Sequence, residues 1–61
     1  MSTYRIKPDG SGWIVSKNGR TISNHRKKSR AKQNAKRKAS PGDMVVEHGQ
    51  NGQILDNRTK R

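Results

Sequence analysis

Large apolar residues are scarce in this chain, because Leu, Ile, Val and Phe together number only eight of its 61 residues. A share below roughly 20 %, combined with high net charge, is typical of intrinsically disordered chains. Lys and Arg number 15 against four Asp and Glu, which gives a formal net charge of +11. A folded chain of this length buries only about 60 % of its unfolded surface. We therefore expect either a disordered polycation or one small domain with a thin core.

Turn and strand signals in the first third of the chain favour the folded alternative. Residues 4–6 alternate apolar and polar side chains with a period of two, which predicts a strand. The Pro-Asp-Gly-Ser-Gly run at 8–12 is a dense cluster of turn formers, and a β-rich run at 13–15 follows it. The Asn-Gly pair at 18–19 is a strong hairpin signal because both residues tolerate positive φ. We expect a third short strand at 20–23, with its isoleucine directed inward.

A helix is predicted for residues 25–39, which contain neither Gly nor Pro and are rich in Lys, Arg, Ala and Gln. Ser23 or Asn24 is the expected N-cap, and the Ser-Pro-Gly run at 40–42 is the expected end of the helix. The alanines at 31, 35 and 39 recur every four residues and therefore fall on one stripe. Because alanine is small, this stripe lets the helix lie close to a sheet.

The last third of the chain predicts a second hairpin, with strands at 43–47 and 53–56 and an Asn-Gly turn within 49–52. The expected fold class is α+β, a small antiparallel sheet in the order β-β-(β)-α-β-β with one basic helix packed on it. We expect a single domain over 1–57 and a basic tail over 58–61. The predicted core consists of Tyr4, Ile6, Trp13, Val15, Ile22, Ala31, Ala35, Ala39, Met44, Val46 and Ile54.

An ordered set of short motifs carries a family resemblance over nearly the whole chain. The motifs are Tyr4-x-Ile6, Gly12-Trp13-x-Val15, a glycine turn at Gly19, Ala31-x-x-x-Ala35, Gly42, and Val46-x-His48-Gly49-x-Asn51-Gly52-x-Ile54. In this order they resemble the small prokaryotic family called domain of unknown function 2188. The resemblance implies a compact sheet with one helix packed on it, and it implies no activity. Helices of that family usually mix acidic with basic residues, so the acid-free helix here suggests a member specialised for a polyanion.

Eight Lys and Arg residues lie within residues 26–38, and no Asp or Glu occurs in 25–39. A charged surface helix normally mixes both signs, whereas an all-basic one is suited to phosphate groups, which Arg can bind in a fork and Lys as a point charge. The sequence therefore predicts a non-enzymatic nucleic-acid-binding protein. The expected binding is dominated by the backbone, is weakly sequence-specific, and favours duplex DNA or structured RNA. The candidate contact residues are Arg26, Lys27, Lys28, Arg30, Lys32, Gln33, Lys36, Arg37 and Lys38.

Two other interpretations remain open. In one, the basic helix docks on an acidic protein partner, as part of a small interaction or regulatory module. In the other, it is a solvated charged face. Basic residues elsewhere can extend either surface. They are Arg5, Lys7, Lys17, Arg20, Arg58, Lys60 and Arg61. The one tyrosine and the one tryptophan, Tyr4 and Trp13, are both expected in the core, which disfavours stacking on single strands. Monomer and homodimer are equally compatible with the sequence.

The sequence offers little for catalysis or for a metal site. Cysteine is absent, so disulfides and thiolate chemistry are excluded. His25 and His48 are the only histidines and the four carboxylates are scattered, so we expect no metal, no cofactor and no enzymatic activity. His48 is instead expected to form a hydrogen bond at the end of the fourth strand. No apolar run approaches the roughly 20 residues of a membrane span, and no secretory segment is visible, so we expect a cytoplasmic protein, nucleoid-associated if it binds DNA.

Overall fold

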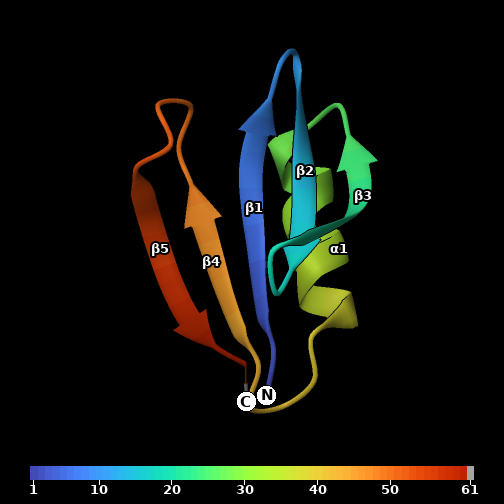
Figure 1. Cartoon of the computed structure of the whole chain (residues 1–61), viewed down its shortest axis with the longest axis vertical. Coiled ribbons are helices and arrows are strands. Elements are labelled where there is room, and N and C mark those ends of the chain that lie inside the picture. Colours follow the sequence, from blue (N-terminus) through green and yellow to red (C-terminus); the bar gives the residue numbers. More distant parts are fainter. Residues whose placement is uncertain (61) are drawn as a thin grey trace.

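Five strands and one helix form the fold of the computed structural model, which describes residues 1–60 (Figure 1). The elements follow one another in the predicted order, which confirms the α+β fold class. Their bounds are β1 Thr3–Asp9, β2 Gly12–Lys17, β3 Arg20–His25, α1 Lys28–Lys38, β4 Met44–His48 and β5 Ile54–Thr59. Within the described residues, no helix is both long enough and apolar enough to cross a membrane.

The strands make one sheet in the order β3-β2-β1-β4-β5. The pairs β1–β2, β2–β3 and β4–β5 are antiparallel, as expected, but β1 and β4 are parallel. The sheet is therefore mixed, and the expectation of a purely antiparallel sheet is corrected at this pair. The cause is α1, which carries the chain back to the end of the sheet where β1 begins, so that β4 starts beside β1 (Figure 1).

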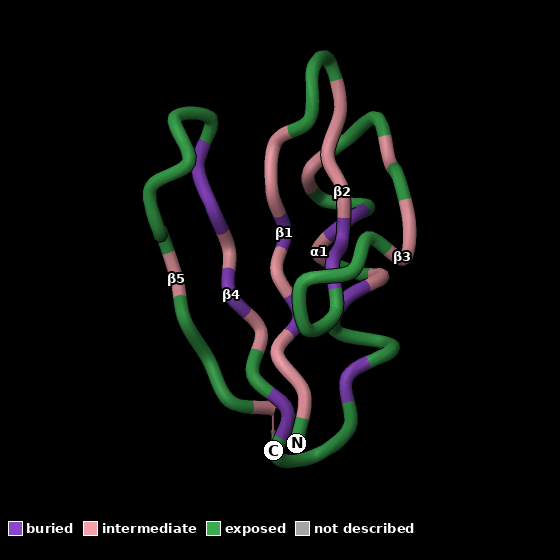
Figure 2. Tube along the Cα trace, viewed as in Figure 1, coloured by how far each residue is buried: buried purple, intermediate pink, exposed green. Residues whose placement is uncertain are grey.

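The core lies between α1 and one face of β1 and β2. Ala31, Ala35 and Ala39 are buried against Ile6 and Val15, which are themselves almost fully inaccessible. The alanine stripe thus faces the sheet as predicted, and its small side chains allow the close approach. Buried positions concentrate on β1, β2, β4 and the inner side of α1, whereas β5 is mostly exposed (Figure 2).

Two predicted core residues, Met44 and Ile54, lie outside the core. Met44 is 36 % exposed and Ile54 is 58 % exposed. In β4 it is Val45 that packs against the cluster under the helix, because it lies opposite Tyr4 in the parallel register and directly paired residues share a face. Val46 is buried as expected, but on the other face of the sheet.

The helix begins later than predicted. β3 continues through Asn24 and His25, which pair with β2, and α1 begins at Lys28 with no side-chain cap on Lys27. Ser23, one of the two expected N-caps, donates its hydroxyl to Asn34 Oδ1 at 3.2 Å and accepts from His25 Nε2 at 2.8 Å. The side chain that could have capped the helix therefore links β3 to the middle of α1.

The end of β5 reaches further than the strand expected at 53–56. Arg58 pairs with Val45 and Thr59 with Met44, and the backbone N–H of Lys60 donates to the backbone carbonyl of Asp43 at 2.8 Å. Arg58 to Lys60, which the sequence placed in a basic tail, are therefore held beside β4. Arg61 lies outside the described residues.

Candidate nucleic-acid interface

The candidate residues of the basic helix divide into two groups by exposure. Lys28 and Lys32 are half-buried, whereas the other seven are exposed: Arg26, Lys27, Arg30, Gln33, Lys36, Arg37 and Lys38. The division follows from the helical repeat, because positions three or four apart share a face. Arg30, Gln33 and Arg37 fall on the side opposite the alanine stripe, while Lys28, Lys32 and Lys36 fall on the flank nearest β4. We call the first of these sets, Arg30, Gln33 and Arg37, the outer face of α1.

Glu47 holds the two half-buried lysines. Its carboxylate lies 2.7 Å from Lys28 Nζ and 3.1 Å from Lys32 Nζ. The Lys28 ammonium also lies 5.0 Å from the centroid of the Trp13 ring, within the range of a cation–π contact. The hydrogen bond from Lys28, followed by that from Lys32, holds the pKa of Glu47 below its ordinary value. Lys28 and Lys32 therefore attach the helix to the sheet, a role that no local sequence pattern indicates because Glu47 lies far from both along the chain.

The other three carboxylates lie away from the outer face of α1. Asp43 accepts backbone N–H groups from Ser2 and Ser40, both at 2.9 Å, and these bonds lower its pKa. Asp56 pairs with Arg58 at 2.9 Å, and Asp9 is exposed at the end of β1. Within residues 1–60, none of the six exposed Lys and Arg side chains of segment 26–38 forms an ion pair. No carboxylate of the described residues therefore compensates their charge.

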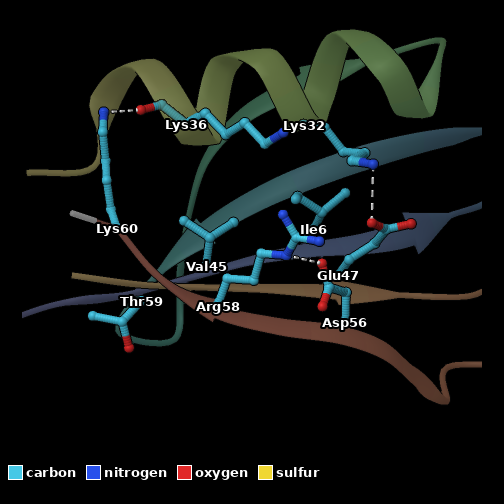
Figure 3. Close-up of a pocket in the computed structure, with 9 residues that line it drawn as sticks. All are labelled: Ile6, Lys32, Lys36, Val45, Glu47, Asp56, Arg58, Thr59 and Lys60. Atoms are coloured by element: carbon cyan, nitrogen blue, oxygen red, sulfur yellow. Dashed lines mark hydrogen bonds and ion pairs between the residues drawn. The ribbon is translucent and has the colours of Figure 1, made fainter. Parts of the chain in front are cut away.

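A groove of about 320 Å³ separates α1 from the β4–β5 hairpin (Figure 3). Lys32 and Lys36 form its helical wall, Asp56 and Arg58 form the opposite wall, and Ile6 and Val45 lie on its floor. Lys60 crosses one end, where its Nζ donates to the backbone carbonyl of Lys36. Two residues from the expected tail, Arg58 and Lys60, thus lie beside the basic helix.

Not every basic residue joins this surface. Lys7 pairs with Ile14, and it alternates with Ile6, which faces the helix. Lys7 and Arg5 therefore lie on the opposite face of the sheet. There Arg5 Nη1 donates to His48 Nε2 at 3.1 Å, while His48 Nδ1 donates to the carbonyl of Gly52 at 3.0 Å. The expected hydrogen bond of His48 at the end of the fourth strand is confirmed.

The fold and this surface define a small α+β domain that carries one strongly basic helix on a mixed sheet. The chain belongs to the family described as an uncharacterized protein conserved in bacteria (DUF2188), whose family model matches residues 4–60. This match confirms the resemblance seen in the sequence motifs. Neither the curated proteins nor the solved structures contain a match to the chain.

Proposed function

We propose that this protein is a non-enzymatic nucleic-acid-binding protein that contacts the phosphate backbone with α1 and the residues just before it. The observation that carries the proposal is the set of six exposed Lys and Arg side chains in segment 26–38 that have no ion-pair partner within residues 1–60. Among residues 1–60, Glu47 is the one carboxylate paired to the helix, and it contacts the flank nearest β4 rather than the outer face. We place this activity in the cytoplasm, on the nucleoid if the ligand is DNA.

The energetic argument rests on counterion release. Like charges spaced by four on a helix destabilise it by a few tenths of a kcal/mol per pair, and a polyanion removes this repulsion. Each phosphate that a Lys or Arg neutralises also releases condensed counterions, so that the logarithm of affinity falls with the logarithm of salt by about 0.9 per contact. Four to six contacts, on the order of the exposed set, correspond to a slope of roughly −4 to −5.

The structure favours double-stranded over single-stranded ligands. Tyr4 is buried, and Trp13 packs against the core beneath Lys28. Neither ring is therefore free to stack on unpaired bases, which is the usual basis of single-strand binding. Gln33 is the one amide on the outer face, between Arg30 and Arg37, and it is the residue placed to contact a base edge.

Fluorescence anisotropy of labelled duplex DNA, duplex RNA and single strands tests the proposal, with salt varied from about 50 to about 300 mM. Arg30→Gln and Arg37→Gln should each reduce the salt slope by about one, and the double variant by about two. Lys7→Gln is the matched control, because it removes one charge from the opposite face of the sheet, and it should leave the slope unchanged. Heparin serves as a polyanion that is not a nucleic acid.

Duplex binding that exceeds heparin binding and weakens only in the helix variants is the expected result. If Lys7→Gln weakens binding as much as Arg37→Gln, the attraction reflects net charge rather than a surface on α1. If heparin is preferred and all nucleic acids dissociate at about 150 mM salt, the proposal is wrong, and an acidic protein becomes the partner to seek.

A further inference from the structure

The groove between α1 and the β4–β5 hairpin is distinct from the outer face of the helix. Its helical wall is the flank with Lys32 and Lys36, whereas Arg30 and Arg37 point away from the sheet on the far side. Two contacts between helix and sheet define its length: Lys32 to Glu47 near one end and Lys60 to the Lys36 carbonyl at the other (Figure 3). Its volume of about 320 Å³ is at the lower end of the range for small-molecule sites.

Arg58 is oriented toward this groove by a carboxylate. Asp56 accepts from Arg58 Nε at 2.9 Å, and this bond leaves both terminal nitrogens of the guanidinium without a partner within residues 1–60. Figure 3 shows one of these nitrogens directed toward the helix and the other directed along the groove toward Glu47. A guanidinium held through Nε offers a pair of parallel N–H donors, which is the geometry that binds a phosphate with two hydrogen bonds.

Lys36 supplies a second cation from the opposite wall. Its backbone carbonyl accepts from Lys60, but its own ammonium has no ion-pair partner within residues 1–60. The two acidic residues of the groove are already paired, Glu47 with Lys28 and Lys32 and Asp56 with Arg58. The lining has four cationic side chains against these two carboxylates, so its formal charge is positive. The donors still available in the groove are therefore cationic, and they suit an anion.

The floor of the groove is apolar. Val45, which is partly buried, lies beneath the cationic rim with the almost inaccessible Ile6 behind it, and the methylene chains of Lys32 and Lys36 border it. A free inorganic ion would use only the rim, whereas a ligand with a compact apolar body would also cover the floor. Burying one small ring strengthens binding by about tenfold, given roughly 25 cal/mol per Å² of apolar surface.

We propose that this groove is a binding site for a small organic phosphate, whose phosphate group lies between Arg58 and Lys36 and whose apolar body lies on Val45 and the adjoining lysine methylenes. The site shares Lys36 with the surface proposed to bind nucleic acid, but it also requires Arg58, which that proposal does not use, so either proposal can fail while the other stands. Phenyl phosphate is the probe. Two control compounds accompany it: inorganic phosphate, which lacks the apolar body, and benzyl alcohol, which lacks the phosphate charge.

The test is a two-dimensional amide NMR titration of the full chain with the three compounds. Phenyl phosphate should shift the amides of Val45, Arg58 and Lys36 and bind at least about tenfold more tightly than inorganic phosphate. Arg58→Gln should weaken phenyl phosphate binding by at least about tenfold, and Lys36→Gln should also weaken it. Arg37→Gln is the matched control, which should lower duplex affinity yet leave phenyl phosphate binding unchanged.

Three results would overturn the site. These are shifts confined to the outer face of α1, equal affinities for phenyl phosphate and inorganic phosphate, and an affinity that Arg58→Gln and Lys36→Gln leave unchanged in folded protein. Duplex anisotropy is measured separately on the same variants. If the unsubstituted chain binds phenyl phosphate but no duplex, the nucleic-acid proposal alone is refuted.

Discussion

Glu47→Gln should make the protein less stable and, at the same time, a tighter binder of nucleic acid. The carboxylate forms two ion pairs, with N···O distances of 2.7 and 3.1 Å, and its side chain is only 16 % exposed. Fully exposed ion pairs contribute about 0.2–1 kcal/mol each. Because both partners here reach a half-buried carboxylate, we take the upper part of that range for each pair. The substitution should therefore lower the free energy of unfolding by about 1–2 kcal/mol.

Thermal and urea unfolding measure the first effect, followed by circular dichroism and by the fluorescence of the single tryptophan, Trp13. For a domain of about 60 residues, a loss of 1 kcal/mol lowers Tm by about 4–8 °C. The pH dependence adds a second check. The pKa of Glu47 is lower in the folded state than its ordinary value of 4.5. In acid the unfolded chain therefore binds more protons than the folded one. The stabilisation from Glu47 is lost as the pH falls from 4.5 through the folded-state pKa. The wild type should lose stability over that interval, and the variant should lose less.

Nucleic-acid affinity measures the second effect. Without the carboxylate, Lys28 and Lys32 are released from their partner, and the formal net charge of +11 rises by one. The salt slope should become steeper, by up to about 0.9 for each lysine that gains a phosphate. A folded variant with unchanged Tm would refute the assigned role of Glu47 in attaching the helix. A folded variant with weaker duplex binding would refute the proposed competition between Glu47 and phosphate.

Three other substitutions test the packing and the turns. Trp13→Ala should lower the free energy of unfolding in urea by about 2–3 kcal/mol, which is less than for a fully buried Trp because the ring is only partly buried. A loss below about 0.5 kcal/mol would show that the ring is not part of the core. Gly12→Ala should destabilise by about 1–3 kcal/mol, since an added Cβ would lie 2.8 Å from the His25 carbonyl oxygen, whereas Ser11→Ala, at an exposed neighbouring position, should leave Tm unchanged. Asp43→Asn should flatten the acid limb of the stability profile, because backbone N–H groups from Ser40 and Ser2 lower the pKa of Asp43 and its stabilisation is lost as pH falls through the folded value; an unaltered pH profile would contradict this.

Local chemistry in the sequence was sufficient to predict most elements of the fold. The hairpin predicted at 18–19 forms with Asn18 at φ 52° and Gly19 at φ 86°, the left-handed conformation that the pair favours. The alanine stripe likewise identified the buried side of α1, because the spacing of four and the small side chain act within one element.

Features that depend on long-range placement could not be predicted in the same way. Met44, Val45 and Val46 are three consecutive apolar residues, so alternation alone does not decide which of them faces the helix, and the register with β1 selects Val45. The pairing of Glu47 with Lys28 and Lys32 has the same origin. It needs α1 and β4 to be neighbours, and no short sequence pattern joins residues so far apart.

The parallel pair β1–β4 also sets an order for folding. Thr3 meets Met44 only after the whole segment between them has been closed into a loop, whereas β1–β2 and β2–β3 close through short turns. Loop closure costs more entropy as the loop lengthens, and pairing between distant strands is slow. The first three strands should therefore become structured before the β4–β5 hairpin docks. Hydrogen exchange should then be fastest, among the strands, in Ile54–Thr59, which is an edge strand like β3 but, unlike β3, packs no residue against the core under α1.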